Sequence, residues 1–242
     1  MKLFPAIDLY EGKAVRLLKG DYARMTVYND DPCSVALDFR AKGAECIHIV
    51  DLEGARDGST PNFDTVSAIK ERSGLFCEIG GGIRSMDTVE QYLSIGIDRV
   101  ILGTAAVKDP DFLKAALKRH GAQIAVGVDI KDGFVAIKGW TESSELEAFA
   151  FCRQLQDMGA GCIICTDISR DGAMRGTNRE LYARLREELS LDITASGGVS
   201  TLEDVKALAQ LGLYGAIIGK AYYTGAIDLA EALAAAKGGA AC

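Results

Sequence analysis

The feature that most constrains the fold of this chain is an internal repeat. The stretch EIGGGIRSMDTVEQYLSIGIDRVILGTAAV, from Glu78 to Val107, aligns without a gap on TASGGVSTLEDVKALAQLGLYGAIIGKAYY, from Thr194 to Tyr223, after a shift of 116 positions. Each copy has the pattern of a short strand, a Gly-Gly turn, an amphipathic helix and an apolar strand that ends at another glycine. Two such units indicate a chain built from parallel βα repeats.

Similar units continue the pattern over the rest of the chain. Apolar runs predict further strands at about 3–8, 45–51, 124–129 and 162–166. Helical spacing predicts helices at about 33–42, 61–74, 86–95, from 110 onward, 144–158 and 226–236. Eight βα units in 242 residues, without an interdomain linker, predict one (β/α)8 TIM barrel over residues 1–242, with half-barrels of about 1–120 and 121–242. An open doubly wound sheet would require a GxGxxG turn after the first strand, which the segment DLYEG lacks.

The connections after four of the strands are expected as loops. They cover residues 10–31, 52–58, 131–141 and 167–172. Alternating residues at 14–18 and an apolar run at 135–137 predict a small hairpin arm in the first of these loops and a short strand in the third. The first loop is long for a compact domain, which is typical of a functional segment. The segment 238–242 is expected as a frayed tail.

Composition excludes several classes of function. The chain has no apolar run long enough to span a membrane and no signal peptide, so we expect a cytoplasmic protein. A net charge of −7 argues against nonspecific nucleic-acid binding. The seven cysteines are scattered and include Cys162 and Cys165 within an apolar strand, which predicts small buried side chains and not a redox pair. Without a Cys/His cluster we expect no metal, and we expect a monomer.

Two aspartates are the leading candidates for catalysis. Asp8 and Asp129 end the first and fifth predicted strands, and in a barrel every strand delivers its last residue to the same face. Neither histidine is expected at the mouth: His48 lies mid-strand, on the opposite side of the sheet from Asp51, and is expected to be packed. Two carboxylates therefore form the best acid–base pair, although the sequence leaves open which is the acid.

Glycine-rich turns at matching offsets predict two phosphate sites. Backbone N–H groups in such turns are natural phosphate cradles. One site would consist of Ser196, Gly197, Gly198, Gly219 and Lys220. Its copy would consist of Gly81, Gly82, Gly103 and Thr104. A substrate with a phosphate at each end would span the mouth and lie over the two aspartates.

Three further residues in the mouth loops are candidates for binding. Trp140, the only tryptophan, lies in a polar loop where stacking on a substrate ring and packing as part of a lid are both plausible. Arg16 and Arg84 are ordinary solvated charges by default, but both lie where a dianion would need neutralising.

Several motifs together resemble a known family. They are Pro5 to Leu9, Val15 to Leu17, His48 to Leu52, Gly80 to Arg84, Gly139-Trp140, Cys165 to Gly172 and Ser196 to Gly198. Over nearly the whole chain they closely resemble the histidine-biosynthesis phosphoribosylformimino-aminoimidazole carboxamide ribotide isomerases. The resemblance implies a (β/α)8 barrel that performs an Amadori rearrangement, from aminoaldose to aminoketose, without a metal or organic cofactor.

The resemblance also implies roles for individual residues. Asp8 would be the base that removes the C2 proton, and Asp129 the acid that protonates the ring oxygen and opens the sugar ring. Thr166 and Asp171 would assist near the reacting sugar, and Trp140 would lie against the imidazole carboxamide. The two glycine sites would hold the two phosphates. Gly20, in the loop that carries Arg16, and Gly172, in the loop that carries Asp171, are also expected at the substrate.

Three alternative functions remain open at this point. The cyclase subunit of imidazole glycerol phosphate synthase shares the fold and the paired aspartates, but the segments at Ala6-Ile7-Asp8 and Val15-Arg16-Leu17 follow the isomerase. A bifunctional isomerase that also accepts phosphoribosylanthranilate differs in loop plasticity. A noncatalytic phosphosugar-binding barrel would keep the glycines but would have no use for both aspartates.

Overall fold

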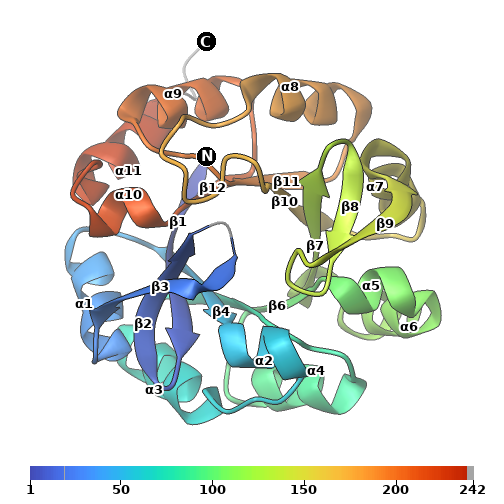
Figure 1. The fold of residues 1–242 in the computed structure, drawn as a ribbon, viewed down its shortest axis with the longest axis horizontal. Coiled ribbons are helices and arrows are strands. Elements are labelled where there is room, and N and C mark those ends of the chain that lie inside the picture. The colour runs from blue at the N-terminus through green and yellow to red at the C-terminus, as the bar shows by residue number, and fades with distance from the viewer. Residues whose placement is uncertain (19, 239–242) are drawn as a thin grey trace.

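Eight parallel strands form a closed barrel in the computed structural model, which describes residues 1–18 and 20–238 (Figure 1). They are β1 (Lys2–Tyr10), β4 (Cys46–Asp51), β5 (Phe76–Gly80), β6 (Arg99–Leu102), β7 (Ile124–Lys131), β10 (Cys162–Asp167), β11 (Asp192–Ser196) and β12 (Gly215–Ile218). Each strand pairs with the next, and β1 pairs with both β12 and β4, which closes the ring. The predicted (β/α)8 barrel is confirmed, while the expectation for residues 239–242 lies outside the described residues.

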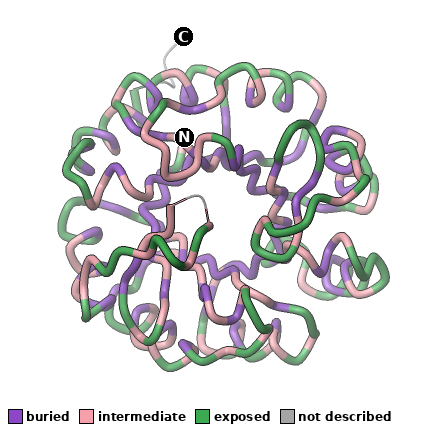
Figure 2. Tube along the Cα trace, in the orientation of Figure 1, coloured by how far each residue is buried: buried purple, intermediate pink, exposed green. Residues whose placement is uncertain are grey.

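The main helices surround this barrel (Figure 1). They are α1 (Pro32–Ala41), α3 (Phe63–Ser73), α4 (Met86–Ser94), α6 (Pro110–His120), α7 (Ala148–Asp157), α8 (Arg179–Glu188), α9 (Leu202–Gln210) and α11 (Leu229–Lys237). Buried residues line the strands and the inner faces of the helices, and exposed residues lie on the outside (Figure 2). Three of the largest fully buried side chains, Tyr92, Tyr182 and Phe39, belong to the main core cluster, while Phe4 belongs to a second, smaller cluster.

Equivalent side chains begin equivalent helices in the two copies of the repeat. The Ser85 side chain accepts a hydrogen bond from the Thr88 N–H at the start of α4, and Thr201 forms a capping box with Asp204 at the start of α9. Such caps satisfy N–H groups that have no partner within the helix. The repeat in the sequence is therefore also a repeat in local structure.

Two of the expected elements were wrong and two had different bounds. Residues 52–57, expected as a loop, form the short helix α2 (Leu52–Asp57), because the Asp51 carboxylate accepts from the Gly54 N–H and caps it. Residues 144–147, expected to begin a helix, belong to strand β9 (Glu142–Glu147), which pairs with β8 (Phe134–Ile137). The expected arm at 14–18 is larger, a hairpin of β2 (Lys13–Leu18) and β3 (Asp21–Asn29). The last helix begins at Leu229 and not at 226.

Shorter helices complete the fold. They are α5 (Thr104–Lys108), α10 (Lys220–Tyr223) and the 3-10 helix η1 (Gly121–Gln123). The helices α5 and α10 follow the barrel strands β6 and β12 directly, so their first residues lie at the carboxyl ends of those strands. Within the described part of the chain, no helix has the length and apolar character needed to cross a membrane.

Candidate active site

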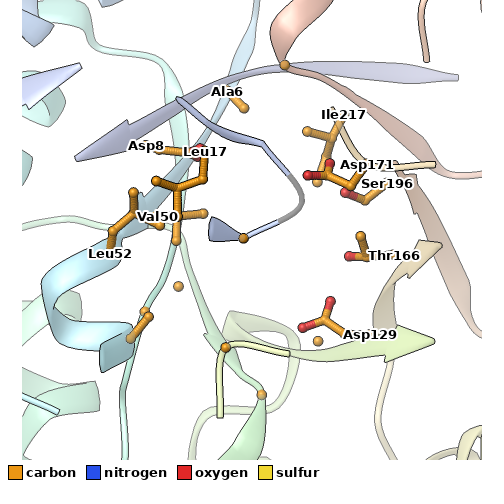
Figure 3. A pocket seen from close by; sticks show the side chains of 18 of the residues that line it. Ala6, Asp8, Leu17, Val50, Leu52, Asp129, Thr166, Asp171, Ser196 and Ile217 are labelled. Carbon is orange, nitrogen blue, oxygen red and sulfur yellow. The ribbon is translucent and has the colours of Figure 1, made fainter. Parts of the chain in front are cut away.

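One cavity of about 280 Å³ opens at the carboxyl ends of the barrel strands (Figure 3). All the candidate site residues inferred from the sequence line it. They are Asp8, Arg16, Gly20, Gly81, Gly82, Arg84, Gly103, Thr104, Asp129, Trp140, Thr166, Asp171, Gly172, Ser196, Gly197, Gly198, Gly219 and Lys220. The fold therefore brings together residues from both halves of the chain. Figure 3 shows Asp129, Thr166, Asp171 and Ser196 on one wall and Asp8 on the other.

Asp8 is held by an arginine. It lies near the carboxyl end of β1 and lines the cavity. The Arg16 Nη1 donates to its Oδ2 over 2.8 Å. The Arg16 Nη2 donates to the Ala6 carbonyl over 2.7 Å, so the guanidinium is fixed by two contacts of β1. Arg16 was expected in a mouth loop as a charge for a dianion; it lies on β2 and directly pairs with the candidate base. It also lies 3.0 Å from where a Gly219 side chain would begin, so it borders one of the glycine turns.

Asp129 lies on β7 opposite Thr166 of β10, in the register that pairs their Cα atoms. Burial raises the pKa of its carboxyl, and hydrogen bonds from the Thr166 hydroxyl and the Trp140 indole lower that pKa by a smaller amount. Because burial dominates, the proton is held more tightly than on a solvent-exposed aspartate. Thr166 and Trp140 thus contact a candidate catalytic group.

Asp171 lies in the segment after β10. Burial raises its pKa to about 6, with smaller contributions from Arg16, which lowers it, and from the nearby Asp8 and Asp129, which raise it. Three carboxylates therefore share one cavity, and mutual repulsion keeps them from all being ionised as easily as separate groups.

The paired glycines are required by close backbone contacts. Gly81 and Gly82 have φ of 117° and 71°, and a Cβ at either position would overlap the backbone of Asp51 or Gly54. In the second copy, Gly197 has φ of 89°, and a Cβ there would come within 2.6 Å of the Asp167 carbonyl. Only glycine combines this conformation with this proximity.

The same polar contacts support both glycine turns. The Asn62 Nδ2 donates to Asp51 over 2.8 Å beside the first turn, and the Asn178 Nδ2 donates to Asp167 over 2.6 Å beside the second. Each Asn lies 116 positions from the other, as each Asp does. The duplication therefore extends to the buried side chains that hold the turns.

The turns that follow β6 and β12 also match in conformation. Gly103 has φ of −101° and ψ of −103°, and Gly219 has φ of −105° and ψ of −107°. Each glycine directly precedes a short helix, α5 or α10, whose first N–H groups lack partners within the helix. The Lys220 Nζ donates to the Gly172 carbonyl over 3.1 Å, which joins the second turn to the segment after β10.

The β2–β3 hairpin and the loop between β8 and β9 meet over the cavity. A Cβ on Gly20, between β2 and β3, would lie 2.8 Å from the Trp140 ring, and both residues line the cavity. Trp140 has a φ of 71°, a left-handed conformation that is rare for a tryptophan. The loop that carries it is tied back by the Lys138 N–H, which donates to the Thr104 hydroxyl over 2.9 Å. Arg84 is farther out, where its Nη1 lies 3.5 Å from the Asp57 carbonyl.

His48 is a cavity residue that sequence reasoning missed. It lies on the opposite side of its strand from Asp51, as alternation predicted, but that side faces the cavity. Its Nδ1 lies 2.8 Å from the Oε1 of Glu78, whose side chain is fully buried. The expectation that no histidine reaches the cavity was wrong. The strand register explains its position, because His48 pairs with Ala6, which lies on the same side of β1 as Asp8.

The described residues contain no group of three or more His, Cys, Asp or Glu side chains arranged to hold a metal ion. The cavity combines acidic side chains, one histidine, three basic side chains and glycine turns. These groups are suited to proton transfer on a substrate that is anchored through anionic ends.

Comparison with known proteins gives one consistent result. The model of a family described as histidine biosynthesis protein matches residues 2–228. A protein of Listeria monocytogenes serovar 1/2a is 48% identical over 231 residues, 96% of either chain. One of Thermodesulfovibrio yellowstonii is 48% identical over 239 residues, 98% of either chain, and one of Lactococcus lactis subsp. cremoris is 49% identical over 231 residues, 95% of this chain and 94% of the relative. All three relatives are named as isomerases of an imidazole-4-carboxamide that bears two 5-phosphoribosyl groups.

Proposed function

Because this chain belongs to the histidine biosynthesis protein family, we propose that it is the aldose–ketose isomerase for which its relatives are named. The reaction is an Amadori rearrangement that converts the aminoaldose phosphoribosylformimino-aminoimidazole carboxamide ribotide to its aminoketose. The observation that carries this proposal is the placement of Asp8 and Asp129 on opposite walls of one cavity, between two glycine turns related by the repeat.

Asp8 is the proposed base. Removal of the C2 proton requires an ionised carboxylate, and the Arg16 guanidinium at 2.8 Å stabilises that form and fixes its direction. Arg16 packs on the Tyr223 ring, with the guanidinium carbon 5.4 Å from the ring centroid, so it is itself held in place. In this proposal Arg16 acts through Asp8 as well as bordering a phosphate.

Asp129 is the proposed acid that protonates the ring oxygen. Burial raises its pKa, which favours the protonated form that an acid needs. Asp171 is a second candidate for this role, on a specific observation: its pKa is raised to about 6, so a part of it is protonated near neutral pH. The charge of the nearby Asp129 contributes to the raised pKa of Asp171.

The two glycine turns are the proposed phosphate sites. Gly81, Gly82, Gly103 and Thr104 line one part of the cavity and Ser196, Gly197, Gly198, Gly219 and Lys220 line another. Each set offers backbone N–H groups, and Lys220 adds a positive charge to the second. The Trp140 ring, which lies against Gly20, is the proposed contact for the imidazole carboxamide between the two ends.

Turnover by the purified protein tests the proposed function. We expect conversion of the aminoimidazole ribotide to the aminoketose, and a decrease in kcat of at least ~100-fold in Asp8→Asn and in Asp129→Asn, with substrate still bound. Asp171→Asn measured beside Asp129→Asn shows which carboxyl is the donor. Near-normal turnover in a variant would remove that residue from the mechanism. Parallel assays with phosphoribosylanthranilate and with ammonia-dependent cyclisation identify a bifunctional isomerase or a cyclase, and no turnover in any assay would contradict the proposal.

A further inference from the structure

A row of polar side chains crosses the barrel interior beneath the cavity. His48, Glu78 and Arg99 lie on the adjacent strands β4, β5 and β6, and the pairing register places them side by side. The side chain of Glu78 is fully buried, and those of His48 and Arg99 are 12% and 9% exposed. His48 Nδ1 lies 2.8 Å from Glu78 Oε1, and Arg99 Nη1 lies 3.6 Å from Glu78 Oε2. Glu78 therefore contacts a histidine on one side and a positive charge on the other.

The second half of the barrel lacks this row. The residues 116 positions later are Ile164, Thr194 and Gly215, and they pair in the same register. Gly215 leaves space for the Phe4 ring, which would lie 2.8 Å from a Cβ at that position. The second half of the barrel therefore forms the equivalent row without a charged side chain. Since burying a carboxylate costs several kcal/mol before its contacts are counted, the charged row is not required for the barrel to close.

The Glu78 contact determines which nitrogen of His48 carries hydrogen. An ionised carboxylate only accepts hydrogen bonds, so the Nδ1 of a neutral His48 carries the hydrogen and donates it to Glu78. The Nε2 then presents a lone pair. Among the described residues Nε2 has no hydrogen-bond partner, and the ring lines the cavity. His48 and Asp129 line the same cavity.

We propose that His48 is a third proton-transfer group of this isomerase, whose Nε2 takes the proton of the C2 hydroxyl as that oxygen becomes the ketone, and that Glu78 is its positioning residue. This inference rests on the proposed function. It identifies a role for a buried pair that neither phosphate binding nor the two aspartates explain.

The protons balance with no further reactant. The acid, assigned above to Asp129, gives its proton to the ring oxygen, and the bond from C1 to that oxygen breaks. Asp8 takes the C2 proton, which forms the C1–C2 double bond. As the C2 hydroxyl loses its proton to His48, its O–H electron pair becomes the carbonyl bond, and the C1–C2 pair takes up a proton at C1 from Asp8. His48 then returns its proton to Asp129, so every group regains its starting state.

Nitrogen-15 NMR of the full-length wild-type protein tests the arrangement without any variant. The chain has two histidines, so His120 is an internal reference. We expect the Nδ1–H form for His48 in the free protein, and a change in its Nε2 resonance when the aminoketose product is added. An Nε2–H form, or an Nε2 resonance that does not respond to product, would overturn the proposal.

Steady-state kinetics test the role in turnover. We expect His48→Gln to reduce kcat by about 100-fold, with KM changed by less than about threefold, because the amide accepts a hydrogen bond but cannot take up the proton. Glu78→Gln should reduce kcat less and should also weaken the Nδ1–H preference of His48 in the spectrum. The matched control is Thr194→Val, the symmetry-related position of Glu78, for which we expect wild-type kinetics.

The two proposals fail in distinguishable ways. A wild-type protein that turns over the ribotide, with His48→Gln within about threefold of its kcat, would leave the isomerase standing and remove His48 from the reaction. A wild-type protein without turnover would contradict the isomerase, while the NMR spectrum would still report on the histidine and its carboxylate. Product binding by His48→Gln, measured by calorimetry, shows that the variant is folded.

Discussion

At the scale of a single residue, the ionisation of Asp171, a proposed catalytic group, also affects the stability of the protein. Burial raises its pKa to about 6, whereas an unfolded aspartate loses its proton near pH ~3.9. Between these two values the folded protein binds more protons than the unfolded chain, so stability falls as pH rises through this window. The contribution is fully present below the unfolded pKa and is lost above about pH 6. At neutral pH the ionised Asp171 therefore lowers the free energy of unfolding.

We therefore expect Asp171→Asn to be more stable than wild type at pH 8, by about 1–3 kcal/mol, because the amide never ionises. The advantage should be smaller at pH 4.5 and should disappear only below about pH 3.9, the unfolded pKa. Thermal unfolding at the two pH values measures the difference, with Asp132→Asn as a control at an exposed position with φ of 51°. A higher Tm for Asp171→Asn at both pH values alike would show that the effect is not ionisation.

Whether His48 faces the cavity could not be predicted from its position in the strand alone. Strand alternation placed it correctly on the opposite side from Asp51. Whether that side is packed core or cavity depends on how far the strands are staggered around the barrel, and the stagger is a property of all eight strands together. The eighteen candidate residues were easier to find, since they end strands or follow them, where the barrel's geometry alone determines exposure to the mouth.

At the scale of elements, the glycine turns are the parts that tolerate the least change. Gly82 has a φ of 71°, and a Cβ there would overlap the Gly54 carbonyl. We expect Gly82→Ala to destabilise the protein by more than about 2 kcal/mol, measured by urea unfolding. Gly161→Ala is the control, because nothing lies within 4 Å of its Cβ position and it should be nearly neutral. Equal effects would mean that the close approach is easily relieved.

The duplicated turns also predict the positions of bound anions. Crystals grown or soaked with sulfate or with the bisphosphate substrate should show two anions, one at Gly82 and Gly103 and one at Gly198 and Gly219. The reason is that both turns present N–H groups in the same conformation. Occupation of only the second site in a bisphosphate complex would contradict the prediction that both glycine turns bind a phosphate.

Two elements were missed because tertiary contacts overrode local sequence. The segment ESSELE has residues that favour helices, yet Glu142–Glu147 pairs with β8 as a strand. Leu52–Asp57 contains a glycine and is followed by another, which favours a loop, but the Asp51 cap supports a short helix. The barrel strands themselves were found reliably, since buried parallel strands have continuous apolar sequences.

At the scale of the whole molecule, we propose that the protein is a monomer. Among the described residues, the exposed large hydrophobic side chains are Val27 and Phe134, at 48% and 45%, and they lie on different strands, β3 and β8. A stable dimer of two such barrels would need a larger apolar surface. Light scattering in line with gel filtration should give a mass near 25.8 kDa. A mass of about twice that value, independent of concentration, would contradict the expectation.

The polar row in one half of the barrel has a consequence for how a substrate enters. The two proposed phosphate sites match in backbone conformation but differ in charge, since only the second contains Lys220, so a bisphosphate of the right length would have two directions in which to lie that are not equivalent. His48 and Glu78 exist on one side only, opposite Ile164 and Thr194. In the proposed complex His48 and Glu78 therefore lie beneath only one half of the substrate, and only one of the two directions would bring the reacting sugar to them.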